Sequence, residues 1–163
     1  MAQLENSYEY IVRKARLEDL DQVISINEAT LPEHYPRWFW EEHVLKWGDA
    51  FYVAEISGKI VGYVMCRVEW GFGILLPGIH RRGHVISIAV LPEYRRRGIA
   101  TSLMNHALTA LRDIYKCREV YLEVRVSNIP AIKLYEKLGF RKVKVIKAYY
   151  ADGEDAYLMA REL

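Results

Sequence analysis

The hydrophobic positions of the chain recur at two different spacings, which separate predicted helices from predicted strands. Residues 17–31 and 37–47 place apolar side chains at helical spacing, and Pro32 ends the first of these helices. A third helix begins at Ile99, because its apolar residues keep a period of about 3.6 as far as Tyr115. The second helix contributes an aromatic cluster that we expect in the core: Trp38, Phe39 and Trp40.

Short runs rich in β-branched and aromatic residues predict the strands. Strict alternation is clearest over residues 119–126, where valine and leucine occupy one face and Tyr121 and Glu123 the other. Ser57-Gly58 separates two such runs and predicts a hairpin turn. Residues 70–83 hold four glycines and a proline, so we expect a mobile loop there. The predicted strands are residues 10–16, 51–56, 59–69, 84–90, 119–126, 140–146 and 156–160.

A fourth helix is predicted after Asn128, which can cap it, with Pro130 in its first turn and Gly139 just past its end. The resulting order, β-α-α-β-β-β-α-β-α-β-β, predicts a mixed sheet with helices on both faces and therefore an α/β fold. The chain has 163 residues, a usual length for one domain. We expect a tail over residues 1–9 and one domain over residues 10–163.

Composition excludes several classes of protein. The chain is 52% hydrophobic, with 23 basic residues against 21 acidic ones, which excludes intrinsic disorder and a dedicated nucleic-acid binder. Its apolar runs fall far short of the roughly 20 residues that span a membrane. The first residues do not resemble a secretory signal, so we expect a cytoplasmic protein. Cys66 and Cys117 are far apart in sequence and favour two reduced, buried thiols, with a disulfide left open.

The segment around residues 88–101 has the pattern of an anion site. Arg95, Arg96 and Arg97 precede Gly98 and the small Ala100 at the start of a predicted helix. Unpaired backbone N–H groups of a first helical turn, together with the helix dipole, attract phosphates. The pattern is neither a P-loop nor a dinucleotide fingerprint, because the required glycines are missing. A solvated basic turn is the alternative interpretation.

The spacing Arg95-x-x-Gly98-x-Ala100 resembles the coenzyme A signature of the GCN5-related N-acetyltransferases, the GNAT family. A second motif of that family is similar to residues 128–140. Residues 31–35, 83–90, 121–125 and 149–157 further resemble the catalytic subunit of N-terminal protein acetyltransferases, with the archaeal form as the nearest match. The resemblance covers nearly the whole chain and implies a single-domain GNAT fold with a splayed, mostly antiparallel mixed sheet. It also implies acetyl-CoA as cosubstrate.

Residue by residue, the resemblance implies where each part of the two substrates binds. The pantetheine arm of acetyl-CoA is expected at the backbone of Ile88, Ala89 and Val90 and at Asn128. The pyrophosphate is expected at Arg96, Arg97, Gly98, Ile99, Ala100 and Thr101. The peptide is expected at Glu33, Tyr35, Tyr149 and Tyr150.

Three polar residues are candidates for the chemistry. The resemblance makes His84 and Glu123 neighbours, and an imidazole with a carboxylate can take a proton from an amine through an ordered water. A structural pair is an alternative, and so is an adventitious metal, although two ligands make a poor site and we expect no metal. Tyr135 is expected near the sulfur, where its phenol can protonate the leaving thiolate, unless it is simply a core tyrosine.

The sequence therefore predicts an acetyltransferase for N-terminal α-amines of proteins, including nascent chains. Direct attack in a ternary complex is expected, because neither cysteine has a nucleophile's surroundings. Lysine side chains or small amines are alternative acceptors, and a non-catalytic coenzyme-binding module is an alternative class. We expect a monomer without an obligatory auxiliary subunit, and no nucleic-acid or membrane partner.

Overall fold

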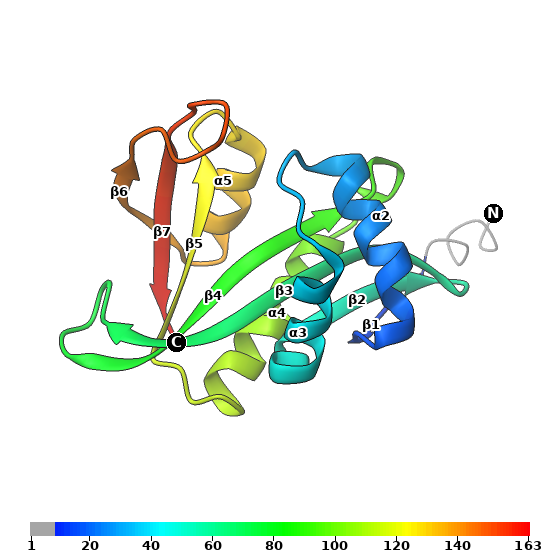
Figure 1. The fold of residues 1–163 in the computed structure, drawn as a ribbon, viewed down its shortest axis with the longest axis horizontal. Helices are drawn as coiled ribbons and strands as arrows, with labels where there is room; N and C mark the ends of the chain where they lie inside the picture. Colours follow the sequence, from blue (N-terminus) through cyan, green and yellow to red (C-terminus); the bar gives the residue numbers. More distant parts are fainter. Residues whose placement is uncertain (1–8) are drawn as a thin grey trace. The chain divides into compact units, whose positions relative to one another are not determined.

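The computed structural model describes residues 9–163, which divide into two compact units (Figure 1). Unit 1 consists of the chain up to Arg67 together with Ile86–Ala110, and unit 2 consists of Val68–Val85 and Leu111–Leu163. Of the tail expected over residues 1–9, residues 1–8 lie outside the described part. The order of helices and strands is the predicted one.

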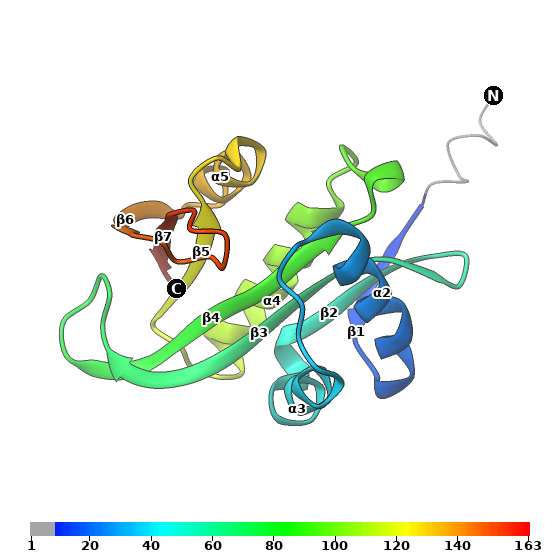
Figure 2. The same cartoon turned by 45° about the horizontal axis from the view of Figure 1, so that its top comes forward.

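Unit 1 contains the N-terminal strands and helices. β1 and β2 pair antiparallel, as do β2 and β3. The predicted hairpin turn joins β2 to β3, with φ of 48° at Ser57 and 83° at Gly58. Helices α2 and α3 lie on one face of these strands and α4 on the other (Figures 1 and 2). The elements are β1 (Ile11–Lys14), η1 (Leu17–Asp19), α2 (Leu20–Thr30), α3 (Arg37–Trp47), η2 (Gly48–Ala50), β2 (Phe51–Ile56), most of β3 (Lys59–Phe72), the end of β4 (Ile79–Val90), η3 (Pro92–Tyr94) and most of α4 (Ile99–Asp113).

The core of unit 1 forms where α2 and α3 cover the strands. Trp40 is fully buried and its ring lies edge-on to Tyr63, with 5.5 Å between centroids. The expectation that all three aromatic residues of α3 are buried is wrong for Trp38, which is 62% exposed. Residues two apart on a helix point in nearly opposite directions, so Trp38 and Trp40 cannot both face the core.

Unit 2 is built on β5 (Glu119–Arg125), α5 (Ile129–Lys137), β6 (Arg141–Ile146) and β7 (Ala156–Glu162), with the first part of β4. β4 pairs parallel with β5, and β7 pairs antiparallel with both β5 and β6. The predicted cap is present, since the Ala131 N–H donates to Asn128 Oδ1 at 3.3 Å. Over both units the strand order is β1-β2-β3-β4-β5-β7-β6, a mixed sheet as predicted.

The expected loop over residues 70–83 is wrong for most of its length, because β3 continues to Phe72 and β4 begins at Ile79. Gly71 and Gly83 make room within strands, whereas Gly73 and Gly78 lie in the turn, where the Gly73 N–H donates to the Gly78 carbonyl at 2.9 Å and Gly78 has a φ of 89°. A Cβ at Gly71 would lie 2.8 Å from Arg82 Cζ, and one at Gly83 would lie 2.7 Å from Leu111 Cδ1. Only residues 73–78 connect the strands, and their mobility stays a prediction.

A buried carboxylate fixes this connection. Glu119 is fully buried at the start of β5 and accepts from the backbone N–H groups of Ile74, Leu75 and Leu76 at 2.5, 2.7 and 3.3 Å. His80 Nε2 lies 2.9 Å from Glu119 Oε1, the oxygen that also accepts from the Ile74 N–H. Burial alone would raise the pKa of Glu119, but these hydrogen bonds outweigh it and hold the pKa below its usual value.

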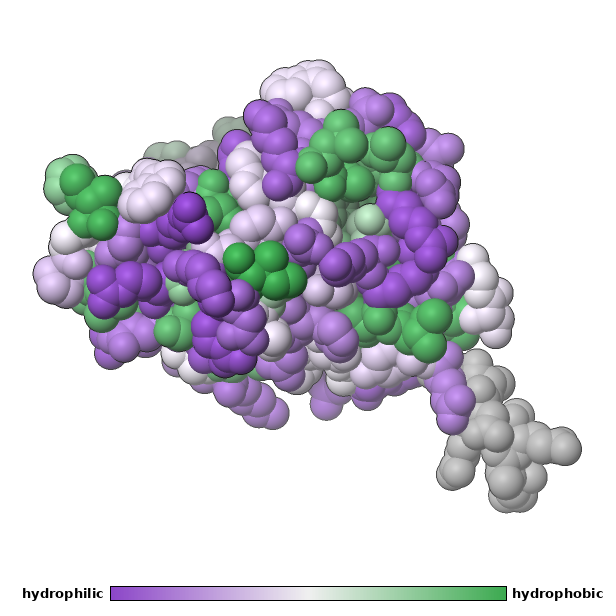
Figure 3. All heavy atoms as spheres, turned by 90° about the horizontal axis from the view of Figure 1, so that it is seen from below, coloured by the Kyte–Doolittle hydropathy of each residue, from purple (hydrophilic) through white to green (hydrophobic). Residues whose placement is uncertain are grey.

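No helix among the described residues is long and apolar enough to cross a membrane. On the face drawn in Figure 3, hydrophobic side chains form separate patches among hydrophilic ones.

Replacing Glu119 by glutamine should lower the free energy of unfolding by about 2–3 kcal/mol, because the amide loses the charge and one acceptor facing buried N–H groups. Denaturant unfolding at pH 7 measures this. Because the pKa is lowered in the folded protein, this stability is present above the pKa of an unfolded glutamate, about 4.3, and is lost as the pH falls further. Glu162→Gln, an exposed change on the paired strand, is the control, and equal stabilities of the two variants would contradict the assignment.

Candidate active site

The predicted site residues fall in both units. In unit 1, the loop before α4 has the backbone form of an anion site. Arg96 and Gly98 both have positive φ, 66° and 78°, and α4 begins directly afterwards at Ile99. The first N–H groups of α4, at Ile99, Ala100 and Thr101, have no earlier helical carbonyl to bond. Alternation of backbone conformation just before a helix start is typical of a concave anion-binding nest.

The arginines around this loop are held by backbone carbonyls. Arg95 Nε donates to the Val90 carbonyl at 2.9 Å, which ties the end of β4 to the loop. Arg97 Nη2 donates to the Glu93 carbonyl at 3.2 Å, and its guanidinium lies 5.6 Å from the ring of Tyr94. These bonds leave the cationic groups close to the start of α4. The coenzyme contacts expected for Ile88, Ala89, Val90 and Arg96–Thr101 stay predictions.

Buried polar groups of unit 1 anchor the loop that carries Glu33 and Tyr35, where the peptide is expected. Asn27 is 1% exposed, and its Nδ2 donates to the Glu33 carbonyl at 3.0 Å and to the Tyr63 hydroxyl at 3.2 Å. The Tyr63 hydroxyl lies 2.7 Å from Ser87 Oγ, next to Ile88 on β4. This hydrogen-bonded line fixes the backbone at Glu33, and no pattern in the sequence identified Asn27 as part of it.

Tyr35 is fixed by its aromatic neighbours. Its ring stacks on Phe39, with 4.6 Å between centroids and 15° between planes, and lies edge-on to Trp40 at 5.7 Å. Its carbonyl accepts from Trp40 Nε1 at 3.2 Å. The aromatic residues of α3 therefore hold the Tyr35 ring and backbone in place, and the packing of this helix determines the shape of the loop.

In unit 2, the structure brings His84 and Glu123 together. Parallel pairing of β4 with β5 sets His84 opposite Tyr121, two residues before Glu123. His84 Nε2 lies 2.8 Å from Glu123 Oε2. On the other side of the ring, Nδ1 lies 3.1 Å from Oε2 of Glu69, a residue near the end of β3 that sequence analysis missed. The imidazole is therefore held between two carboxylates.

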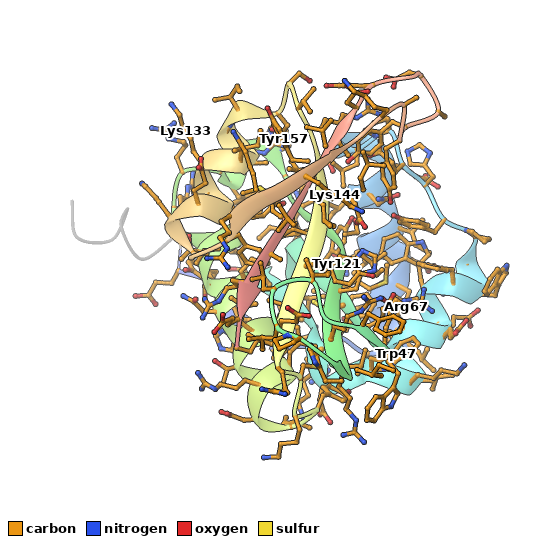
Figure 4. The ribbon with its side chains drawn as sticks, turned by 90° about the vertical axis from the view of Figure 1, so that its left-hand side faces the viewer. Trp47, Arg67, Tyr121, Lys133, Lys144 and Tyr157 are labelled. Carbon is orange, nitrogen blue, oxygen red and sulfur yellow. The ribbon has the colours of Figure 1, made fainter. Side chains whose placement is uncertain are left out.

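Two further side chains complete this group, which we call the His84 cluster: Glu69, Arg82, His84, Tyr121 and Glu123. Tyr121 lies on β5 (Figure 4), donates its hydroxyl to Glu69 Oε1, and stacks on the His84 ring with 4.1 Å between centroids. Arg82 Nη2 lies 3.5 Å from Glu69 Oε1. Alternation along β4 places residues 82 and 84 on one face, and alternation along β5 does the same for residues 121 and 123. This alternation is the pattern by which the sequence could have indicated Arg82 and Tyr121 as members of the cluster.

The charges of the cluster support one another. Burial alone would lower the pKa of His84, but its hydrogen bonds to Glu123 and Glu69 outweigh burial and raise the pKa above its usual value. The hydrogen bond from His84 lowers the pKa of Glu69 to about 2. Burial and the hydrogen bond to Glu69 raise the pKa of Tyr121, which stays a neutral phenol. At neutral pH the cluster thus holds an ionised Glu69 beside a readily protonated imidazole.

The turn that carries Tyr149 and Tyr150 is also in unit 2 and is organised by Arg125. Arg125 Nη1 donates to Asp152 Oδ2 at 2.8 Å and to Glu154 Oε1 at 2.9 Å. Its guanidinium lies 4.0 Å from the ring centroid of Tyr150, and the two tyrosine rings are perpendicular at 4.9 Å. The turn thus presents two ordered phenols, with Tyr149 47% exposed.

Two further expectations concern Tyr135 and a metal. Tyr135 is buried on α5, with its ring 6.0 Å from that of Phe140, so packing accounts for part of its surroundings, and its catalytic role stays a prediction. Within the described part of the chain, no group of three or more His, Cys, Asp or Glu side chains forms a metal site. The cysteines are free and buried, and burial raises the pKa of Cys117 to about 11.

The chain also matches a known protein family. Residues 15–140 match the acetyltransferase (GNAT) family, and the chain belongs to that family. This confirms the family resemblance and the GNAT fold predicted from the sequence.

Within this family the chain is similar to several N-terminal acetyltransferases. The chain is 55% identical to an N-alpha-acetyltransferase of Saccharolobus solfataricus, over 100% of this chain and 99% of the relative. Ard1 from Thermoplasma volcanium superposes with a TM-score of 0.81 at 27% identity, covering 94% of this chain and 97% of that chain. Naa20 of Chaetomium thermophilum, solved with a bisubstrate analogue, gives a TM-score of 0.82 at 33% identity, covering 94% and 86%.

Replacing Gly98 by glutamate should weaken coenzyme A binding at least 10- to 150-fold, the usual cost of losing one charge-assisted contact. The change puts negative charge beside the expected pyrophosphate and strains a residue at φ 78°. Calorimetric titration with coenzyme A measures the affinity. Gly58→Glu is a matched control, since Gly58 also has positive φ, 83°, and open space around it. Equal affinities of the two variants would remove the phosphate assignment.

Proposed function

We propose that this protein transfers the acetyl group of acetyl-CoA to the N-terminal α-amino groups of proteins. The observation that carries the proposal is the 2.8 Å hydrogen bond between His84 and Glu123. It supplies a proton acceptor in a GNAT chain that is 55% identical over its full length to a relative named N-alpha-acetyltransferase. Binding of a thioester and removal of a proton from an amine are the two requirements of this reaction.

The reaction proceeds by direct attack. The neutral amine forms a bond to the thioester carbonyl carbon, the carbon–sulfur bond breaks, and the amide and coenzyme A thiolate result. The proton lost by the amine passes through water to the pair of His84 and Glu123. The buried cysteines, with the pKa of Cys117 raised, are unsuited to an acyl-enzyme.

The remaining predicted residues bind and orient the two substrates. The nest at Arg96–Thr101 takes the pyrophosphate, and the backbone of Ile88–Val90 and the Asn128 side chain take the pantetheine arm. Tyr135 supplies the proton that neutralises the thiolate. Glu33 and Tyr35, with Tyr149 and Tyr150, bind the first residues of the peptide. Ordered phenols offer hydroxyl groups to an extended peptide backbone.

The acceptors are the N-termini of cytoplasmic proteins, including nascent chains, and the protein acts as a monomer without an auxiliary subunit. An α-amine has a pKa near 7.7–8.0, so roughly 10–17% of it is neutral at pH 7. An α-amine therefore needs only a weakly basic group, such as the pair of His84 and Glu123, to take its proton. A lysine amine, with a pKa near 10.4, is only about 0.04% neutral at that pH.

The proposed function predicts strong preference for α-amines. At pH 7 a peptide with a free N-terminus should react about 300-fold faster than the same peptide with a blocked N-terminus and an internal lysine, from the neutral fractions alone. Thiol release from acetyl-CoA, with mass spectrometry to locate the acetyl group, measures both rates. Spermidine and free lysine serve as small-amine controls. Absence of peptide-dependent thiol release would overturn the function, and equal rates on the two peptides would overturn the choice of acceptor.

The two members of the proton acceptor should be energetically coupled. His84→Ala and Glu123→Ala should each lower kcat, and the double variant should lose less than the product of the two losses, because each single change already breaks the shared hydrogen bond. Coenzyme A affinity should stay within about twofold in all three. Steady-state kinetics and calorimetry provide these values. Fully multiplicative losses in kcat would mean that the residues act independently.

A further inference from the structure

The hydrogen-bond geometry of His84 fixes how many protons its ring carries. Each ring nitrogen faces a carboxylate oxygen, Glu123 Oε2 at 2.8 Å and Glu69 Oε2 at 3.1 Å. An ionised carboxylate only accepts hydrogen bonds, and a neutral imidazole has one N–H. Both contacts are satisfied together only when His84 carries a proton on each nitrogen. The ring is only 15% exposed, so the two carboxylates are the main partners of its nitrogens in the resting protein.

Glu69 is built to remain an anion. It accepts from the Tyr121 hydroxyl, lies 3.5 Å from Arg82 Nη2, and bonds His84 Nδ1. A carboxylate with three donors has its charged form stabilised by all of them. The titratable and charged groups that face His84 come from three strands: Glu69 on β3, Arg82 on β4, and Tyr121 and Glu123 on β5. Glu69 is therefore the fixed negative charge on the Nδ1 side of the ring.

We propose that Glu69 is a positioning residue for proton transfer: it retains the Nδ1 proton of His84, keeps the ring charged in the resting protein, and sets the pH at which Nε2 becomes able to accept a proton. This inference rests on the proposed function and adds a third member to the pair of His84 and Glu123. In the active form Nε2 has released its proton to solvent, while Nδ1 still donates to Glu69. As the carbon–nitrogen bond forms and the carbon–sulfur bond breaks, the amine proton passes through water to Nε2.

The sign of the effect follows from charge. A group whose pKa is raised in the folded protein loses its proton at higher pH, so acceptor activity appears as the pH rises through the pKa of His84. Removing the negative charge of Glu69 lowers that pKa and moves the onset of activity to lower pH. Removing only the Tyr121 hydroxyl takes one hydrogen-bond donor away from Glu69. The onset of activity then moves to higher pH or stays unchanged.

The test compares kcat–pH profiles of Glu69→Gln, Tyr121→Phe and the wild type at saturating peptide. Glutamine keeps an oxygen that accepts from Nδ1, and phenylalanine keeps the ring stacked on His84, so both variants preserve the packing. We expect the acid limb of Glu69→Gln to move down by about one pH unit or more, with a lower plateau because the acceptor is a weaker base. The substrate amine titrates identically in all variants, so a difference between them belongs to the protein. Glu136→Gln, an exposed change on α5, is the control for net charge.

A second measurement does not depend on activity. Nitrogen-15 NMR of the histidine side chains, assigned by loss of the signal in His84→Gln, distinguishes imidazolium from neutral imidazole. We expect His84 to be imidazolium at pH 6.5 in the wild type and in Glu136→Gln, and largely neutral in Glu69→Gln. A neutral His84 in the wild type at that pH, or identical acid limbs in Glu69→Gln and the wild type, would overturn the inference. Absence of peptide acetylation would instead overturn the proposed function and leave the NMR result to decide the role of Glu69.

Discussion

Charges removed from water must be paired, and this constraint organises unit 2. Its fully buried carboxylate, Glu119, accepts four hydrogen bonds and thereby fixes the connection between β3 and β4. His84 on β4 lies between the carboxylates of Glu69 on β3 and Glu123 on β5. Breaking a buried pair typically costs about 3–5 kcal/mol because one charge is left without compensation. The same hydrogen bonds therefore stabilise the strand ends and fix the protonation of the imidazole, so stability and chemistry cannot be varied independently here.

Unit 1 differs from unit 2, because its core is mainly apolar and its predicted functional groups are mostly backbone groups. Helix α3 packs Trp40 against Phe51 of β2 and Tyr63 of β3, and its Phe39 and Trp40 rings hold Tyr35. A line of buried polar groups, from Asn27 through Tyr63 to Ser87, joins the backbone at Glu33 to β4. Burial raises the pKa of Tyr63 to about 12, so this hydroxyl stays neutral. A neutral line of hydrogen bonds fixes geometry without adding charge to the unit.

The parts of the fold that sequence could predict are those with a local cause. Helix and strand order, the Ser57-Gly58 turn and the Asn128 cap all follow from spacing or from one residue's conformational preference. The strand ends within residues 70–83 could not be predicted, because Gly71 and Gly83 make room for the side chains of Arg82 and Leu111, and only Gly73 and Gly78 belong to the turn. For the site, the family resemblance implied His84 and Glu123, but Glu69 depends on which strands become neighbours. A single sequence without that pairing does not specify its partner.

The His84 cluster also explains why an α-amine, which is less basic than a lysine amine, suits this site as the acceptor of the acetyl group. The imidazole shares its protons with two carboxylates, and its pKa lies above the usual value of a histidine. Transfer of a proton from an α-ammonium to this imidazole is therefore closer to balanced in free energy than transfer to an ordinary histidine. Transfer from a lysine ammonium, about 2.6 pKa units higher, is uphill by a further 3.5 kcal/mol or so at fixed geometry. Raising the basicity of His84 further would narrow this gap but would also keep the ring protonated and inactive at neutral pH. The charge of Glu69 therefore raises the proton affinity of His84 but lowers the fraction of rings whose Nε2 is free to accept a proton. The balance between these two effects determines how strongly the site discriminates between amines.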